Sequence, residues 1–191
     1  MTKITLGILA SGSGSNFAAI AQAFAANSQI QIGVLIYNNP TAQVAQRAAA
    51  LNIPALLLDH REFTNRAALD QAIADVLATY KVDLVVMAGW MRIVTQVLID
   101  AYPDRILNIH PSLLPSFPGI HAVEQALSYG VKITGCTVHL VSLAVDSGPI
   151  LAQAAVEITP EDTVSSLQAK IQVQEHRIYP AAIAAHAQTL L

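Results

Sequence analysis

The sequence predicts an α/β protein with a mostly parallel, doubly wound sheet and helices on both faces. In the N-terminal half, short apolar, β-branched segments alternate with longer alanine-rich segments, which is the pattern of repeated βα units. The chain has 191 residues, 53% hydrophobic and 12% charged, which suits one folded core and excludes a disordered chain. Its longest apolar stretches run to about eight residues, whereas a membrane span needs about twenty.

The individual elements follow from this alternation. Five strands are expected in the N-terminal part, at residues 4–9, 32–37, 55–58, 84–88 and 105–109. The alanine-rich segments that follow the first four strands are expected to be helices, at residues 16–26, 43–51, 64–80 and 95–102. Each helix therefore returns the chain to the start of a parallel strand.

The C-terminal part has a different composition. Residues 110–121 contain three prolines and a glycine, which predict a long loop without regular structure. Residues 134–141 and 149–158 are expected to be two further strands, joined by a short connection and paired antiparallel, which makes seven strands. A helix is expected from Thr163, with a break at Pro180. Because no linker or repeat divides the chain, residues 1–191 are expected to form a single domain.

Charge and cysteine content exclude several classes of function. Ten Lys and Arg against thirteen Asp and Glu give a net charge of −3 without a basic run, which argues against a nucleic-acid partner. The N-terminal apolar run leads into a glycine-serine loop, so we interpret it as a strand and expect neither a targeting signal nor membrane association. The single cysteine, Cys136, is expected to be buried in a protein of a reducing compartment, the cytoplasm.

No metal site is expected, because the histidines lack metal-ligand spacing. Outside position 110 we interpret them as structural or peripheral, and His139 lies nearest the candidate site in sequence. They are His60, His121, His139, His176 and His186.

The segment after the first strand reads SGSGSN, residues 11–16, and leads into a helix. Ligands of open α/β sheets bind at the carboxyl ends of strands, and a helix N-terminus favours an anion such as phosphate. A dinucleotide fingerprint is incomplete, because Phe17 stands where a third glycine belongs and no acidic residue ends the second strand. A nucleoside-triphosphate loop would need a nearby lysine. A phosphomonoester site and a capped turn without a ligand are the two remaining interpretations.

A second group of polar residues ends the fifth strand. Strand alternation places Asn108 and His110 on one face, where an amide and an imidazole could polarise a carbonyl group and move a proton. Asp146 lies in the connection between the last two strands, and a carboxylate against His110 would favour the charged ring and fix its orientation. A structural histidine is the alternative. Arg66 and Arg92 follow the third and fourth strands and could meet an anionic ligand or lie in solvent.

Six blocks occur in an order and spacing that carry a family resemblance: SGSGSN, MAGWMRIV, NIHPSLLPSFPGIHAVEQAL, GCTVHLV, VDSGPILAQ and QEHRIYP. Over residues 4–180 the chain resembles the phosphoribosylglycinamide formyltransferase family. The resemblance implies a Rossmann-like formyltransferase fold and transfer of a formyl group from 10-formyltetrahydrofolate, the co-substrate, to the amine of glycinamide ribonucleotide in purine biosynthesis. It implies no metal.

The resemblance also implies roles for individual residues. The family's catalytic Asn, His and Asp fall on Asn108, His110 and Asp146, which would stabilise an oxyanion and relay protons. Its phosphate-binding residues fall on Gly14, Ser15 and Asn16, and a residue that holds the ribose falls on Glu175. The folate-binding positions are Arg66, Met91, Arg92, Ile93, Val94, Asn108, Ser142, Leu143, Ala144 and Val145.

Two departures from the family and several alternatives are relevant. Residues 142–145 carry no charge where relatives are often acidic, so folate contacts by backbone atoms would survive and contacts by acidic side chains would not. Ser116 stands where lysine is common. A 10-formyltetrahydrofolate hydrolase would use the same three residues but is expected to carry an extra N-terminal domain. A methionyl-tRNA formyltransferase would need a C-terminal domain and a basic surface. A non-catalytic α/β module that binds a phosphate ligand is the third alternative, and a homodimer is compatible with the sequence.

Overall fold

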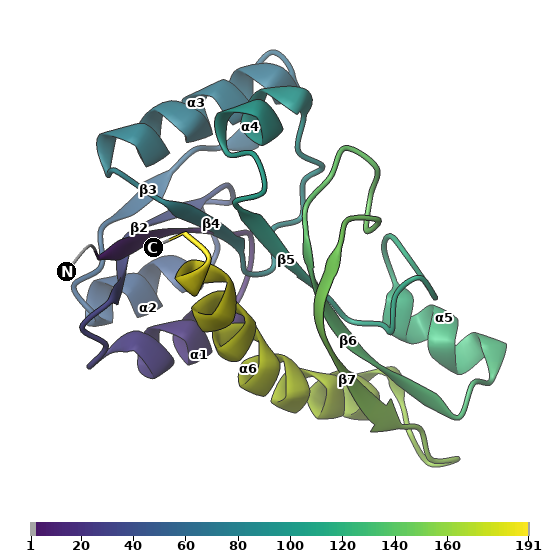
Figure 1. Cartoon of the computed structure of the whole chain (residues 1–191). Helices are drawn as coiled ribbons and strands as arrows, with labels where there is room; N and C mark the ends of the chain where they lie inside the picture. The colour runs from purple at the N-terminus through teal and green to yellow at the C-terminus, as the bar shows by residue number, and fades with distance from the viewer. Residues whose placement is uncertain (1–2, 191) are drawn as a thin grey trace.

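The computed structural model describes residues 3–190 and contains one seven-stranded sheet in the order β3-β2-β1-β4-β5-β6-β7 (Figure 1). Strands β1 to β5 run parallel, β6 is antiparallel to β5, and β7 is antiparallel to β6. The predicted sheet, with its final antiparallel pair, is therefore confirmed. The strands are β1 (Ile4–Ala10), β2 (Ile30–Tyr37), β3 (Ala55–Leu57), β4 (Leu84–Met87), β5 (Ile106–His110), β6 (Ile133–Leu140) and β7 (Ile150–Glu157).

Helices cover both faces of this sheet (Figure 1). One core lies between the sheet and α1, α2 and α6, and a second lies between the opposite face and α3 and α4. None of the helices within residues 3–190 is both long and apolar enough to cross a membrane. The helices are α1 (Ser15–Phe24), α2 (Val44–Ala50), α3 (Arg66–Thr79), α4 (Gln96–Ala101), α5 (Ala122–Tyr129) and α6 (Val164–Gln188), with a 3₁₀ turn η1 (His60–Glu62).

Helix α5 is not among the elements expected from the sequence, and α6 lacks the break that was expected within it. Helix α5 follows the proline-rich loop, buries Ala122, Val123 and Ala126, and ends at Gly130 in the left-handed conformation. The predicted break at Pro180 is wrong, because α6 continues through this residue to Gln188. Proline removes one backbone hydrogen bond from a helix. Burial of residues on both sides of it, Tyr179 and Ile183 among them, outweighs that loss.

Helix α6 is fixed beneath the middle of the sheet by Tyr179. This side chain is fully buried, and its hydroxyl lies 3.1 Å from the carbonyl oxygen of Met87 and 3.0 Å from that of Leu107. Those carbonyls belong to β4 and β5, so the helix is held against both strands. Glu175 lies one helical turn before Tyr179, on the same face of the helix.

The strand order reverses between β1 and β4, which is the point where ligands bind in open α/β sheets. The loops that leave these two strands are joined by two hydrogen bonds. The Ser11 N–H donates to the Gly89 carbonyl at 3.0 Å, and the Ser11 hydroxyl accepts from the Met91 N–H at 2.9 Å. The glycine-serine loop and the loop after β4 therefore form one edge.

Candidate active site

The register of the sheet places a histidine beside Asn108. Parallel pairing sets Asn108 next to Met87 of β4, and antiparallel pairing sets it next to His139 of β6. The Asn108 side-chain nitrogen lies 3.2 Å from Nε2 of His139, while Nδ1 of His139 lies 2.8 Å from the carbonyl oxygen of Leu140. Because a carbonyl only accepts, Nδ1 carries a proton, which leaves Nε2 to accept from the amide.

His110 and Asp146 form an ion pair next to this amide. Nδ1 of His110 lies 3.3 Å from Oδ2 of Asp146, and Nε2 of His110 lies 2.8 Å from the carbonyl oxygen of Phe117. The Gly119 N–H donates to the same carboxylate at 2.8 Å, and Nε2 of His139 lies 3.7 Å from its other oxygen. Both nitrogens of His110 thus face acceptors, and the ring satisfies both only as an imidazolium.

The carboxylate of Asp146 is held in its ionised form. Burial raises the pKa of Asp146, but the contact with His139, the Gly119 N–H and the charge of His110 together outweigh burial. The net pKa lies below the ordinary value. The cluster therefore presents a fixed negative charge between two imidazole rings, which is an arrangement suited to moving protons.

The proline-rich loop is anchored by a fully buried threonine of β6. The hydroxyl of Thr137 donates to the Ser112 carbonyl at 2.7 Å and accepts from the Leu114 N–H at 3.0 Å. The side-chain amide of Gln153, on β7, donates to the same hydroxyl at 3.0 Å. These bonds fix the loop that brings the Phe117 carbonyl and the Gly119 N–H to the ion pair.

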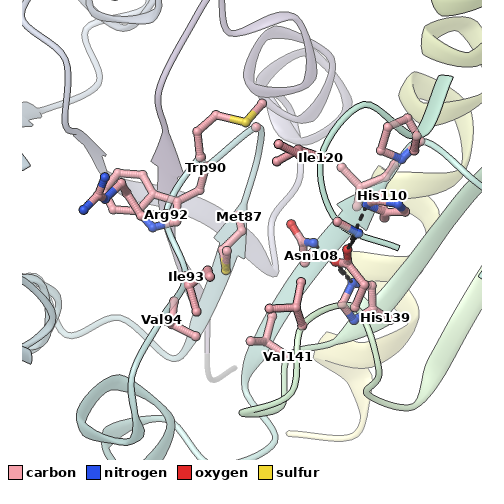
Figure 2. A pocket seen from close by; sticks show the side chains of 18 of the residues that line it. Met87, Trp90, Arg92, Ile93, Val94, Asn108, His110, Ile120, His139 and Val141 are labelled. Carbon is pink, nitrogen blue, oxygen red and sulfur yellow. Dashed lines mark hydrogen bonds and ion pairs between the residues drawn. The ribbon is translucent and has the colours of Figure 1, made fainter. Parts of the chain in front are cut away.

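A cavity of about 780 Å³ opens beside the cluster. Figure 2 shows Trp90, Arg92, Ile93 and Val94 on the side of the cavity opposite His110 and His139. Nε1 of Trp90 and Nε of Arg92 are buried and have no hydrogen-bond partner among the described residues. The cavity thus combines apolar walls with a polar corner formed by Asn108, His110, His139 and Asp146, as small-molecule sites do.

The glycine-serine loop presents backbone groups instead. Gly14 has a φ of +76°, and a Cβ there would lie 2.5 Å from Cγ2 of Val44, so this position requires glycine. The first bond of α1 runs from the Ala18 N–H to the Gly14 carbonyl at 3.0 Å, which leaves the N–H groups of residues 15–17 free of intrahelical partners. Such groups bind anions.

Asn16 and Glu175 lie together below this loop. The Asn16 side-chain amide donates to the Glu175 carboxylate at 2.9 Å. Both residues are buried, with exposed fractions of 8% for Asn16 and 6% for Glu175. Burial raises the pKa of Glu175, although the hydrogen bond from Asn16 opposes the shift. Oδ1 of Asn16 is buried and has no partner in the described part of the chain.

The structure brings together most of the residues implied for folate binding, and all three catalytic candidates line the same cavity. Arg66 begins α3 as an exposed residue outside the lining, and exposed Ala144 also lies outside it, so their roles stay predictions. The folate candidates that do line the cavity are Met91, Arg92, Ile93, Val94, Asn108, Ser142, Leu143 and Val145.

Three members of the site were missed from the sequence. The sequence indicates a structural or peripheral role for His139, the histidine nearest the candidate site in sequence, whereas strand pairing places it opposite Asn108. Phe117 and Gly119 act through backbone atoms, for which residue type gives no signal. Cys136 is buried as expected, and burial raises its pKa to about 12.

Comparison with known proteins agrees with this geometry. A model of the formyl transferase family matches residues 4–183. The chain belongs to the formyl transferase family. The resemblance seen in the sequence blocks is thereby confirmed.

Relatives within the formyl transferase family are similar over nearly the whole chain. The phosphoribosylglycinamide formyltransferase of Bacillus subtilis (strain 168) is 44% identical over 177 residues, 92% of this chain and 91% of that protein. The trifunctional purine biosynthetic protein adenosine-3 of Homo sapiens is 41% identical over 95% of this chain, which corresponds to 18% of that protein. The crystal structure of glycinamide ribonucleotide transformylase 1 from Symbiobacterium toebii superposes with a TM-score of 0.96 at 46% identity, covering 98% of this chain and 89% of that one.

The side chains of this formyl transferase do not form a metal centre within residues 3–190. No group of three or more His, Cys, Asp or Glu side chains in this range is arranged to hold a metal ion. The polar groups that contact one another at this end of the cavity are an amide, two imidazoles and a carboxylate, from Asn108, His110, His139 and Asp146.

Proposed function

We propose that the protein transfers the formyl group of 10-formyltetrahydrofolate to the amino group of glycinamide ribonucleotide in purine biosynthesis. The observation that carries this proposal is the juxtaposition of Asn108, His110 and Asp146 at one wall of a large apolar cavity. An anion-binding loop lies at the same edge of the sheet, tied to that cavity through Ser11. Proteins named for this reaction are the relatives described above.

The cavity suits the folate co-substrate. A volume of about 780 Å³ falls within the usual range for small-molecule sites, roughly 300–1,000 Å³. Apolar side chains such as Ile93 and Val141 would contact the flat ring system. Three of the uncharged residues 142–145 also line the cavity: Ser142, Leu143 and Val145. Because they carry no charge, polar contacts from this segment to the folate would come chiefly from the backbone.

The other end of the site suits a ribonucleotide. The free N–H groups of residues 15–17 would bind its phosphate, and Gly14 gives the backbone the shape that this requires. Glu175 would accept hydrogen bonds from ribose hydroxyls, but it is buried against Asn16 and must turn toward the ligand or be reached at its edge. Substrate binding and chemistry are thus assigned to different segments.

Formyl transfer needs both charge stabilisation and proton transfer. The substrate amine attacks the formyl carbon, negative charge develops on the formyl oxygen, the bond from that carbon to the folate N10 breaks, and a proton passes from the amine to N10. The half-buried Asn108 amide has a second hydrogen to donate to the oxyanion beside the one it gives His139. Asp146 and its two imidazoles would accept and return the proton, directly or through water.

His110 can donate to the oxyanion only by exchanging a partner. Its Nε2 donates to the Phe117 carbonyl at 2.8 Å, and its Nδ1 faces Asp146. Delivery of the Nε2 proton to a substrate oxygen therefore requires that the Phe117 carbonyl withdraws. Asn108 needs no such exchange, so it is the donor already in place.

A formyl-acceptor comparison tests the proposed function. Purified protein is given 10-formyltetrahydrofolate with glycinamide ribonucleotide, with water alone, or with methionyl-tRNA, and both formyl product and released tetrahydrofolate are measured. We expect transfer to glycinamide ribonucleotide far above release without it. Release that is equal with and without this acceptor would favour the hydrolase, and formyl-methionyl-tRNA would favour the tRNA enzyme. Trp90, the single tryptophan, gives an independent fluorescence signal for folate binding.

We further propose that residues 1–191 act as a single domain in the cytoplasm and assemble as a homodimer. A single, buried cysteine supports the reducing compartment. Tyr129 and Ile133, which are 80% and 58% exposed next to the start of β6, offer apolar side chains for a contact between copies. Light scattering at micromolar concentration tests the assembly, and a monomer mass would contradict it.

A further inference from the structure

Helix α2 supports the glycine-serine loop through its first turn. The Val44 N–H donates to the Gly12 carbonyl at 3.2 Å, and the Val44 side chain occupies the space next to Gly14. One turn later, Nε of Arg47 donates to the Ser13 carbonyl at 2.8 Å. Three consecutive loop residues are therefore held by one helix, and the last of these contacts comes from a charged side chain.

Arg47 also supplies the charge of a cavity that runs along α1 from its first residue. This cavity, about 660 Å³, is lined by Ser15, Arg47 and His176 together with small and polar residues of α1. Burial lowers the pKa of His176, so this ring is neutral at neutral pH. Arg47 is then the permanent cation of the lining.

The guanidinium of Arg47 keeps donors available. In the part of the chain that the structure describes, no carboxylate lies within 4.0 Å of it, and its hydrogen bond to Ser13 uses Nε. The two terminal nitrogens are free to face an anion, and guanidinium groups match phosphate geometry with paired N–H donors. The free backbone N–H groups of residues 15–17 belong to the first turn of α1, the helix that contributes Ser15 to this cavity.

We propose that Arg47 determines specificity for a phosphorylated substrate, by adding a charge to the backbone anion site and by fixing the loop that forms it. This inference rests on the proposed function and names the residue that separates glycinamide ribonucleotide from its unphosphorylated riboside. Arg47 lies far from the cluster of Asn108, His110 and Asp146 in the sheet, on α2. It therefore acts on substrate capture and leaves turnover unchanged.

The test uses three variants of the full chain. Arg47→Gln removes the charge, and Arg47→Lys keeps the charge but lacks the planar guanidinium group. The control, Arg105→Gln, removes an exposed arginine that precedes β5 at the end of the strand opposite the site. For each we measure kcat and kcat/KM with glycinamide ribonucleotide and with glycinamide riboside, and thermal unfolding as a check of the fold. A charge-assisted contact to phosphate predicts that Arg47→Gln loses about tenfold or more in kcat/KM for the ribonucleotide.

The expected pattern is selective. Arg47→Gln keeps kcat for the ribonucleotide and kcat/KM for the riboside, Arg47→Lys falls between wild type and Arg47→Gln, and Arg105→Gln behaves as wild type. An equal loss for both acceptors, or no loss for either, overturns the inference. Binding of D-ribose 5-phosphate, measured by titration, tests the role of Arg47 independently of the proposed formyl transfer. If the wild type transfers no formyl group, weaker binding of this probe to Arg47→Gln still supports the role of Arg47, and unchanged binding overturns it.

Discussion

The glycine-serine loop and the cluster of Asn108, His110, His139 and Asp146 are built in opposite ways. The loop uses backbone groups of one contiguous segment, residues 11–17, and its side chains matter where they shape that backbone. The cluster uses side chains from β5, β6 and the β6–β7 connection, and each of its contacts depends on one particular side chain. Backbone donors survive most substitutions, whereas a single side chain has no substitute. Changes in the cluster should therefore reduce turnover, and changes in the loop should reduce substrate binding.

Asp146→Asn should give the largest effect. The change removes the charge that the imidazolium of His110 faces and places an amide beside a ring nitrogen that needs an acceptor. We expect kcat to fall by about 10³-fold or more, since similar changes in carboxylate-histidine pairs have effects of this size. Steady-state assays with both substrates at saturation provide the measurement. Near-normal turnover would exclude Asp146 from the mechanism.

His139→Gln should have a smaller effect on the same step. His139 accepts the hydrogen bond of the Asn108 amide, so its loss leaves that amide less well oriented but keeps the ion pair between His110 and Asp146. Loss of one such hydrogen bond predicts a fall in kcat of about tenfold. A matched change at half-buried His60, which lies in η1 next to Asp59 and away from the cavity, serves as the control. If both variants turn over alike, His139 has no role in catalysis.

Gly14→Ala tests the loop, and Gly12→Ala is its matched control. A Cβ at position 14 would meet the backbone and side chain of Val44 and strain a φ of +76°, whereas a Cβ at Gly12 meets nothing within 4 Å. We expect Gly14→Ala to lower the free energy of unfolding by about 1–3 kcal/mol and to raise KM for the ribonucleotide, with kcat retained. Equal behaviour of the two variants in urea unfolding would contradict this view of the loop.

The sequence predicted the parts of the molecule that depend on local pattern. Apolar alternation located the strands, and the period of two placed Asn108 and His110 on one face. It did not reveal that His139 lies opposite Asn108, because the pairing register between distant strands is decided by tertiary packing. Phe117 and Gly119 contribute backbone atoms, whose direction depends on the loop conformation. Pro180 indicates a helix break when the local sequence is considered alone. Burial of the neighbouring side chains against the sheet stabilises the helix through this residue.

Glu175→Gln should give the smallest effect, and one that depends on pH. Burial raises the folded-state pKa of Glu175 above its unfolded value of about 4.5, so the folded state binds the proton more tightly. Stability of the wild type therefore falls as pH rises from 4.5 through the folded pKa, and glutamine, which can still accept from Asn16, avoids this loss. Urea unfolding at about pH 4 and about pH 7 should show the variant gaining only at the higher pH. If the wild type instead becomes more stable relative to the variant as pH rises, the raised pKa of Glu175 is contradicted.

The most direct test of the division between loop and cluster is Asn108→Ala, followed in two quantities. The first is kcat for formyl transfer, and the second is the dissociation constant for glycinamide ribonucleotide, measured by calorimetry without folate. Loss of an oxyanion donor predicts a fall in kcat of about 10²–10³ with an unchanged dissociation constant. Parallel loss of turnover and binding, or full turnover, would show that chemistry and substrate capture are not separated between these two regions.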